Sequence, residues 1–296
     1  MTNIIPKSAL VSLSDKTNLD LLVTFLLDRD VRIISTGGTY KAIKKITDKV
    51  IEVSEYTGHK EMMDGRVKTL HPKIHAGILA RRGEDTDELK SMDYEEIDIV
   101  IVNLYPFEET LKSECSFEEA IEQIDIGGPT MIRAAAKNFK DVLVLSDPSD
   151  YKEMIDEWNS NNGISYKFRK KQATKVFKKM SQYNKAIHQY MDSENDENVI
   201  IDLSNPKALR YGENPHQKAK LYLKESSQKK NIANADVLQG KELSYNNIAD
   251  SDAAWECLKQ FQKPACVIVK HANPCGVSES EAVSYTHLTL PTTWLV

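Results

Sequence analysis

Two turns near the start of the chain combine glycine, hydroxyl and lysine residues directly after apolar runs. SLSDKTNLD (12–20) follows the first run, and STGGT (35–39) follows the second. Glycines let a backbone approach a ligand closely, and free N–H groups at the start of a helix attract anions. Each turn taken alone also fits an ordinary helix cap. Two such turns at neighbouring strand ends would lie together, so the pair indicates a phosphate-binding site.

The segment MDGRVKTLHPKIHAG (63–77) is dense in hydrogen-bond donors. Clustered Arg66 and Lys68 suit an anionic substrate and a negative oxygen that develops during a reaction. His71 and His75 lie four residues apart, as some zinc ligands do, but no third ligand is evident and a proline lies between them. The spacing therefore favours a structural or substrate-contacting role, and we predict no metal site.

Two later segments carry residues that could transfer or hold a proton. In NLYPFEET (103–110), Tyr105 follows a strongly apolar run and could be a proton donor or a buried ring with a bonded hydroxyl. In IDIGGPTMIRAAAKN (124–138), Asp125 precedes a glycine turn and the start of a predicted helix. Taken by itself, an aspartate at this place would be interpreted as a helix N-cap. Lys137 lies on the same predicted helix, about two and a half turns beyond the glycines.

The elements that position these residues alternate between strand and helix. Apolar, β-rich runs predict strands, and helix-like spacing between them predicts helices. Repeated alternation indicates an α/β fold in which helices cover a parallel sheet. The predicted strands cover residues 9–14, 31–35, 50–53, 98–107 and 142–147, and helical patterns cover 18–30, 39–46, 128–138 and 149–190.

Composition places the chain among ordinary globular proteins. Of its 296 residues, 41% are hydrophobic and 28% are charged, and the formal net charge is −5. No apolar run approaches the roughly 20 residues that span a bilayer. The acidic balance argues against nucleic acid, so the basic segment 166–190 is interpreted as a solvated helix. The four cysteines form no CxxC pair, and we expect a reduced, cytoplasmic protein.

Seven segments, taken in chain order, resemble one family. They run from about residue 8 to residue 280 and read SDKT, STGGT, GRVKTLHPKIHAG, NLYPF, IDIGGPTMIRAAAKN, LRYGENPHQ and VKHANPCG. The chain resembles the bifunctional purine biosynthesis protein, which joins phosphoribosylaminoimidazolecarboxamide (AICAR) formyltransferase to IMP cyclohydrolase.

This resemblance implies a domain organisation. Residues 1–198 would form an IMP cyclohydrolase domain with a methylglyoxal-synthase-like parallel sheet, ending in the acidic linker 191–198. Residues 199–283 would form the N-terminal fragment of a cytidine-deaminase-like transformylase domain. The stretch 284–296 has no Asp, Glu, Lys or Arg and does not fit the family, so we expect a chain truncated at its C-terminal end.

The resemblance also implies the residues of the cyclohydrolase site. Lys68 would stabilise the negative oxygen, and Asp125 would accept or orient the amide proton. Tyr105 and Lys137 would supply a proton or hold the other groups, and the assignment of acid and base stays open. The residues that would hold the nucleotide are Ser14, Lys16, Thr17, Ser35, Thr36, Gly37, Gly38, Thr39, Arg66, Thr69, Asn103, Gly127 and Gly128.

In the second region the resemblance implies a transformylase site. Arg210 and Tyr211 match the nucleotide-contacting motif, and Lys270 and His271 match the catalytic Lys–His pair, in which the histidine would be the general base. The family step transfers a formyl group from 10-formyltetrahydrofolate to the amine of AICAR. We expect this step to be lost here, because the matching sequence stops near Val283.

The implied activity is closure of formyl-AICAR to IMP with loss of water, without a metal or an organic cofactor. The expected partners are the nucleotides formyl-AICAR, IMP and AICAR and a second copy in a homodimer, with no nucleic acid and no membrane. Two alternatives share the fold: a nucleotide- or phosphate-sensing module, and methylglyoxal synthase. A sensor would not need Lys68, Tyr105, Asp125 and Lys137, and the synthase would not need LRYGENPHQ or VKHANPCG.

Overall fold

The chain divides into two compact units, Met1–Asp196 and Glu197–Val296, and each is described by itself. Most of the predicted linker 191–198 and all of the atypical stretch 284–296 lie outside the described residues. The computed structural model describes residues 2–63, 65–105, 107, 115–192, 201, 203–224 and 231–281.

The first unit is built on a five-stranded sheet, which confirms the predicted parallel α/β fold. The strand order is β3-β2-β1-β4-β5, and every neighbouring pair is parallel. In this arrangement the carboxyl ends of β1, β2 and β4 share one edge of the sheet, where ligands commonly bind. The strands are β1 (Ser8–Leu13), β2 (Arg32–Ser35), β3 (Val50–Glu52), β4 (Ile99–Asn103) and β5 (Leu143–Leu145).

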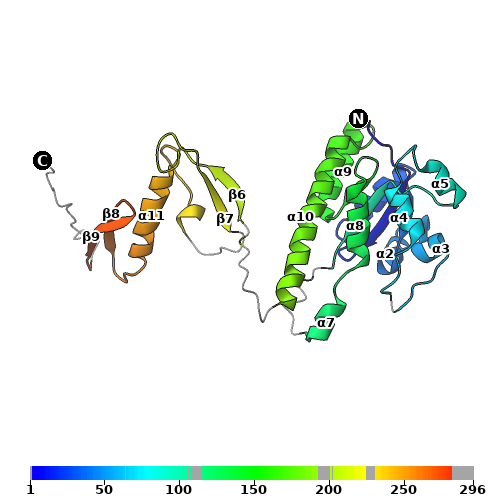
Figure 1. Cartoon of the computed structure of the whole chain (residues 1–296), viewed down its shortest axis with the longest axis horizontal. Coiled ribbons are helices and arrows are strands. Elements are labelled where there is room, and N and C mark those ends of the chain that lie inside the picture. The colour runs from blue at the N-terminus through cyan, green and yellow to red at the C-terminus, as the bar shows by residue number, and fades with distance from the viewer. Residues whose placement is uncertain are drawn as a thin grey trace. The chain divides into compact units, whose positions relative to one another are not determined.

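Helices cover both faces of the sheet (Figure 1). Side chains alternate along each strand, so β4 sends Ile99 and Ile101 into one core and Val100 and Val102 into the other. The helices are α1 (Leu19–Asp28), α2 (Gly37–Ile43), α3 (Val53–Thr57), α4 (Pro72–Leu79), α5 (Thr86–Ser91), α7 (Phe117–Glu122), α8 (Gly127–Lys137), α9 (Tyr151–Asn161) and α10 (Tyr166–Met191).

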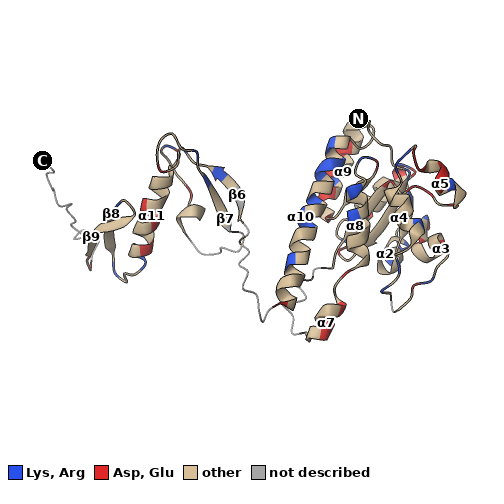
Figure 2. Cartoon of the chain, viewed as in Figure 1, with Lys and Arg blue, Asp and Glu red and all other residues tan. Residues whose placement is uncertain are grey.

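Helix α10 is more than the solvated helix that its basic sequence predicts. Its lysines lie along the outside, as Figure 2 shows, and two of them pair with carboxylates: Lys171 with Glu153 and Lys175 with Asp150. One face is nevertheless buried against α8 and β5. The residues buried on that face are Phe168, Arg169, Gln172, Ala173, Val176 and Met180.

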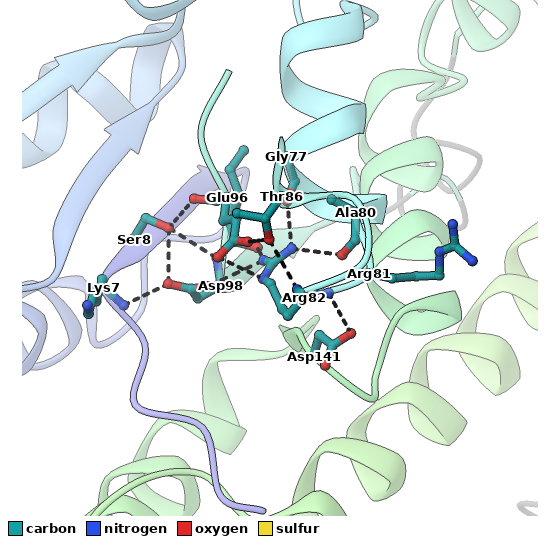
Figure 3. Close-up of polar contacts among 12 residues, drawn as sticks. Lys7, Ser8, Gly77, Ala80, Arg81, Arg82, Thr86, Glu96, Asp98 and Asp141 are labelled. Atoms are coloured by element: carbon teal, nitrogen blue, oxygen red, sulfur yellow. Dashed lines mark hydrogen bonds and ion pairs between the residues drawn. The ribbon is translucent and has the colours of Figure 1, made fainter. Parts of the chain in front are cut away.

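A polar network fastens the amino ends of β1 and β4 (Figure 3). The Arg82 guanidinium donates to the carbonyl oxygens of Ala80 at 2.9 Å and Ile97 at 2.8 Å, and it lies 3.3 Å from the Asp98 carboxylate. The other oxygen of Asp98 accepts the Lys7 backbone N–H at 2.8 Å. Because Lys7 precedes β1 and Asp98 precedes β4, Arg82 fixes the starts of both central strands.

The second unit contains two antiparallel hairpins and one longer helix. Among its described residues no apolar side chain is as fully buried as those around the first unit's sheet. None of the described helices in either unit combines the length and apolar character needed to cross a membrane. The elements are β6 (Leu203–Ala208), β7 (Lys220–Lys224), a 3-10 turn (Ile232–Asn234), α11 (Tyr245–Leu258), β8 (Ala265–Lys270) and β9 (Asn273–Glu279).

Candidate active site

A cavity of about 800 Å³ opens at the carboxyl edge of the sheet in the first unit. Its walls come from the ends of β1, β2 and β4, the loop before α4, the segment after α7 and the start of α8. The predicted site residues that line it are Ser14, Lys16, Thr36, Gly37, Gly38, Thr39, Arg66, Lys68, Thr69, Asn103, Tyr105, Asp125, Gly127 and Gly128.

Asn103 holds the first turn of the pocket in place. Its side-chain oxygen accepts the backbone N–H groups of Ser14 at 2.7 Å and Asp15 at 3.1 Å. Its side-chain nitrogen donates to the Asp15 carbonyl at 2.7 Å. Both ends of this amide are therefore used within the protein, which makes Asn103 a support for the turn that a ligand would contact.

Threonine side chains join the second turn to the first. Thr39 Oγ1 accepts the Leu13 N–H at 2.8 Å and lies 3.0 Å from the Leu13 carbonyl, to which it donates. Ser12 and Thr36 share a hydrogen bond of 2.9 Å between their hydroxyls. The two turns predicted from sequence to be neighbours are therefore bonded directly to each other.

Two consecutive residues connect both glycine turns of the pocket. The Lys68 ammonium lies so close to Gly37 that a Cβ there would be 2.6 Å from Nζ. A Cβ on Gly127 would be 2.6 Å from Thr69 Oγ1. A methyl group at either position would force the neighbouring side chain to move, so both glycines allow this close approach. Lys68 Nζ also donates to Glu61 Oε2 at 2.7 Å, and this pairing lowers the pKa of Glu61.

Asp125 is the carboxylate best placed for proton transfer. It is largely buried, and this burial raises its pKa, while hydrogen bonds from the Gly128 and Gly127 backbone N–H groups act against the rise. The Gly128 bond to Oδ1 is 2.9 Å long. A carboxylate with a raised pKa binds a proton more readily than an ordinary aspartate, as a general base requires.

Tyr105 and Arg66 lie at the accessible side of the pocket. Tyr105 is 55% exposed, so its predicted alternative as a buried ring is wrong. Arg66 forms an ion pair with Glu122 at the end of α7, and its Nε lies 3.2 Å from Glu122 Oε2. This pair joins the loop before α4 to α7 across the pocket.

Three predicted site residues do not line the pocket. Thr17 donates to Asp15 Oδ1 at 2.7 Å, and buried Ser35 donates to the Val11 carbonyl at 2.8 Å. Lys137 is exposed at the C-terminal end of α8. At about 1.5 Å per residue, nine residues of helix separate it from the pocket end of α8 by roughly 13 Å. The expected contribution of Lys137 to this pocket is therefore not seen, and its catalytic role stays a prediction.

The two histidines of the basic segment make contacts with other groups of the protein. His71 Nδ1 accepts the Lys73 N–H at 3.1 Å and caps α4, and its ring lies 5.0 Å from that of His59. His75 is half-buried, and burial lowers its pKa. Within the described ranges, no group of three or more His, Cys, Asp or Glu side chains could hold a metal ion.

Comparison with known proteins places this fold and pocket in a family. A model described as "MGS-like domain" matches residues 19–130, and a model described as "AICARFT/IMPCHase bienzyme" matches residues 135–289, just over half of the chain. The chain belongs to the AICARFT/IMPCHase bienzyme family. A solved structure named "Crystal structure of ForH" is 32% identical over 63% of this chain and 99% of that chain, with a TM-score of 0.55.

Hydrogen bonds join both motifs of the second unit to α11. Arg210 stacks on the Tyr211 ring at 4.9 Å, and the Tyr211 carbonyl accepts the first N–H of α11 at 3.1 Å. Lys270 ends β8, and His271 follows it in the left-handed region with φ 54°. The next backbone N–H donates to Asp250 of α11 at 2.7 Å.

Sequence reasoning missed several residues that shape the pocket. Glu61 lies only seven residues before Lys68, so a search for carboxylates near the basic segment could have found it. Glu122 lies two residues before the motif 124–138 and gave no separate signal, and Ser12 lies within the motif 12–20 but was not predicted as a site residue. Tyr183 contacts Asp125 from α10, 58 residues further along the chain, and no local pattern indicates it.

Proposed function

We propose that this chain closes the ring of formyl-AICAR to form IMP and water, as a step of purine biosynthesis, and that the first unit carries the reaction. The observation that supports it most directly is Asp125, a largely buried carboxylate with a raised pKa, in the same pocket as Lys68 and the glycine turns. A phosphate-sensing module needs the glycine turns and lysines but has no use for such a carboxylate.

The phosphate of the nucleotide fits the two bonded turns. Backbone N–H groups near Gly37 and Gly38, together with one hydroxyl of the bonded Ser12–Thr36 pair, would supply donors for phosphate oxygens. Lys16 adds a positive charge on the same wall. This end of the pocket would bind the substrate and product equally and so would contribute to affinity rather than to rate.

The reacting end needs a base and a stabilised oxygen. The carboxamide nitrogen of formyl-AICAR attacks the formyl carbon, and Asp125 accepts the proton that this nitrogen loses. The former carbonyl oxygen becomes negative, and the Lys68 ammonium stabilises it. That oxygen takes up two protons, the one held by Asp125 and the one that the formamide nitrogen gives up as the C=N bond forms, and it leaves as water, which makes the closed ring aromatic. Because both reacting groups belong to one molecule, holding them close supplies much of the rate enhancement.

The supporting experiment follows the ultraviolet absorbance of formyl-AICAR with the full chain and no folate. We expect conversion to IMP, and we expect Asp125→Asn to lower the rate at least about 100-fold, the size typical of a lost general base. Lys270→Ala, in the other unit, is the matched control and should leave the rate unchanged. A folded chain that binds IMP without converting formyl-AICAR would indicate a sensor, and formation of methylglyoxal from dihydroxyacetone phosphate would indicate the synthase.

We also propose that the described part of the second unit does not support formyl transfer. Lys270 and His271 lie at an exposed hairpin turn, and no apolar side chain in the described part of that unit is buried as in a packed core. A catalytic pair needs a rigid surrounding shell to hold its geometry. Incubation with AICAR and 10-formyltetrahydrofolate should yield neither formyl-AICAR nor IMP, and formation of either product would refute this proposal.

A further inference from the structure

Helix α10 places one tyrosine hydroxyl on the backbone of Asp125. The Tyr183 oxygen accepts the Asp125 N–H at 2.8 Å. We infer that Tyr183 is a positioning residue, which fixes the Asp125 carboxylate in the orientation needed to take the proton from the substrate. This inference rests on the proposed function, since it assigns a role in the same reaction.

Asp125 is held by two hydrogen bonds, one at its backbone N–H and one at its side-chain carboxylate. Its backbone N–H bonds to Tyr183, and its carboxylate accepts the Gly128 N–H at 2.9 Å. The second bond alone would leave the peptide before Asp125 free to rotate. With both bonds, the residue is fixed between α10 and the start of α8, so its carboxylate keeps one position relative to the pocket.

An aromatic cluster keeps Tyr183 in place. The ring of Phe107 packs edge-on against Tyr183, with 6.3 Å between ring centres, and edge-on against Tyr190 at 5.8 Å. Phe117, the first residue of α7, stacks on Tyr190 at 5.6 Å. Tyr183 also packs against the core around α8. The hydroxyl therefore points from a rigid platform, which suits a supporting role for a catalytic group.

Loss of this hydroxyl would leave the Asp125 N–H without an acceptor in a largely buried position. A phenylalanine ring fills the same space but offers no lone pair, so the backbone would move to find water or another acceptor. Such a movement would turn the carboxylate toward solvent and lower its raised pKa. The other titratable groups that line this pocket are Lys16, Arg66, Lys68, Tyr105 and Glu122, and the substitution leaves them all in place.

The test compares Tyr183→Phe with Tyr190→Phe in the full chain. Tyr190 packs on the same Phe107 ring, so its variant controls for the loss of a tyrosine hydroxyl from the same aromatic cluster. We expect Tyr183→Phe to lower kcat about 10-fold, with KM changed less than about 2-fold, as for a lost buried hydrogen bond that orients a catalytic group. In a plot of kcat against pH, the fall in kcat on the acidic side should move to lower pH. Tyr190→Phe should change neither quantity.

Two measurements do not depend on turnover. The first is the pKa of the Asp125 carboxyl, followed by NMR with carbon-13-labelled aspartate and assigned with Asp125→Asn; it should fall in Tyr183→Phe. The second is hydrogen exchange of the Asp125 amide in the unsubstituted chain, which should be slow.

The outcomes separate this inference from the proposed function. If the chain does not convert formyl-AICAR but the Asp125 pKa falls only in Tyr183→Phe, the proposed function fails and the positioning role stands. If the chain is active and Tyr183→Phe matches it in kcat, pH profile and Asp125 pKa, the inference is overturned. Fast exchange of the Asp125 amide, or equal effects in Tyr190→Phe, would overturn it as well.

Discussion

Gly37→Ala probes the close contact between the phosphate turn and Lys68. Gly37 has φ 39°, in the left-handed region, and an added Cβ would lie 2.6 Å from Lys68 Nζ. The backbone strain should cost about 1–2 kcal/mol of unfolding free energy. For a unit of this size that corresponds to a fall in Tm of roughly 2–8 °C. The ammonium must also move by about 1 Å to reach ordinary contact distance, and misplacement on that scale can lower the rate about 100-fold.

Two other glycines separate the two effects. Gly58 also has a positive φ, 72°, but a Cβ there meets nothing within 4 Å, so Gly58→Ala should lose stability and keep its activity. Gly38 is outside the left-handed region and equally open, so Gly38→Ala should keep its stability. Thermal melts and the absorbance assay measure both quantities. If Gly37→Ala is destabilised like Gly58→Ala but converts formyl-AICAR at the normal rate, the position of Lys68 does not govern the reaction.

Three further predictions concern charged groups. Lys68→Ala should lower turnover about 100-fold in the absorbance assay, the typical loss of one oxyanion-stabilising donor; a near-normal rate would remove Lys68 from that role. Arg82→Ala should lower the free energy of unfolding by about 2–3 kcal/mol in urea, because buried acceptors lose their donor. Replacing its neighbour Arg81, whose side chain is 62% exposed, with alanine should lower the free energy of unfolding much less, and equal losses would contradict this reasoning. Burial lowers the pKa of His75 below 6.5, so the unfolded chain binds its proton first and stability should fall as pH drops below that value. His75→Gln should flatten this part of a Tm-against-pH curve, and an unchanged curve would contradict this reasoning.

The sequence predicted the sheet well because each strand is a buried apolar run. The predicted strand at 98–107 is too long, because the observed strand β4 ends at Asn103. Leu13, the last residue of β1, pairs with Asn103, so no neighbouring strand continues the ladder. Leu104 and Phe107 are apolar because they are buried in the core beside the loop. Hydrophobicity reports burial, whereas the length of a strand depends on its partners.

The candidate site was predictable where it depends on local chain geometry. Glycine turns after strands converge because parallel strands end at one edge, and the two predicted turns meet as expected from that rule. Contacts that depend on a loop folding back or on a distant helix were not predictable. Glu61 reaches Lys68 through the loop before α4, and Tyr183 reaches Asp125 from α10. Lys137, whose role was implied by the family resemblance, does not line the described pocket, and that role stays a prediction.

Two of the three cations that line the pocket are already in ion pairs, and this affects how ligand binding responds to salt. Lys68 is paired with Glu61, and Arg66 with Glu122, and both carboxylates are more than half exposed. An incoming phosphate or carboxamide oxygen therefore exchanges with a carboxylate of the protein instead of neutralising a bare cation. Added salt screens the contact that is broken as well as the one that forms. The affinity for anionic nucleotides should consequently depend on ionic strength less steeply than three unpaired cations would suggest.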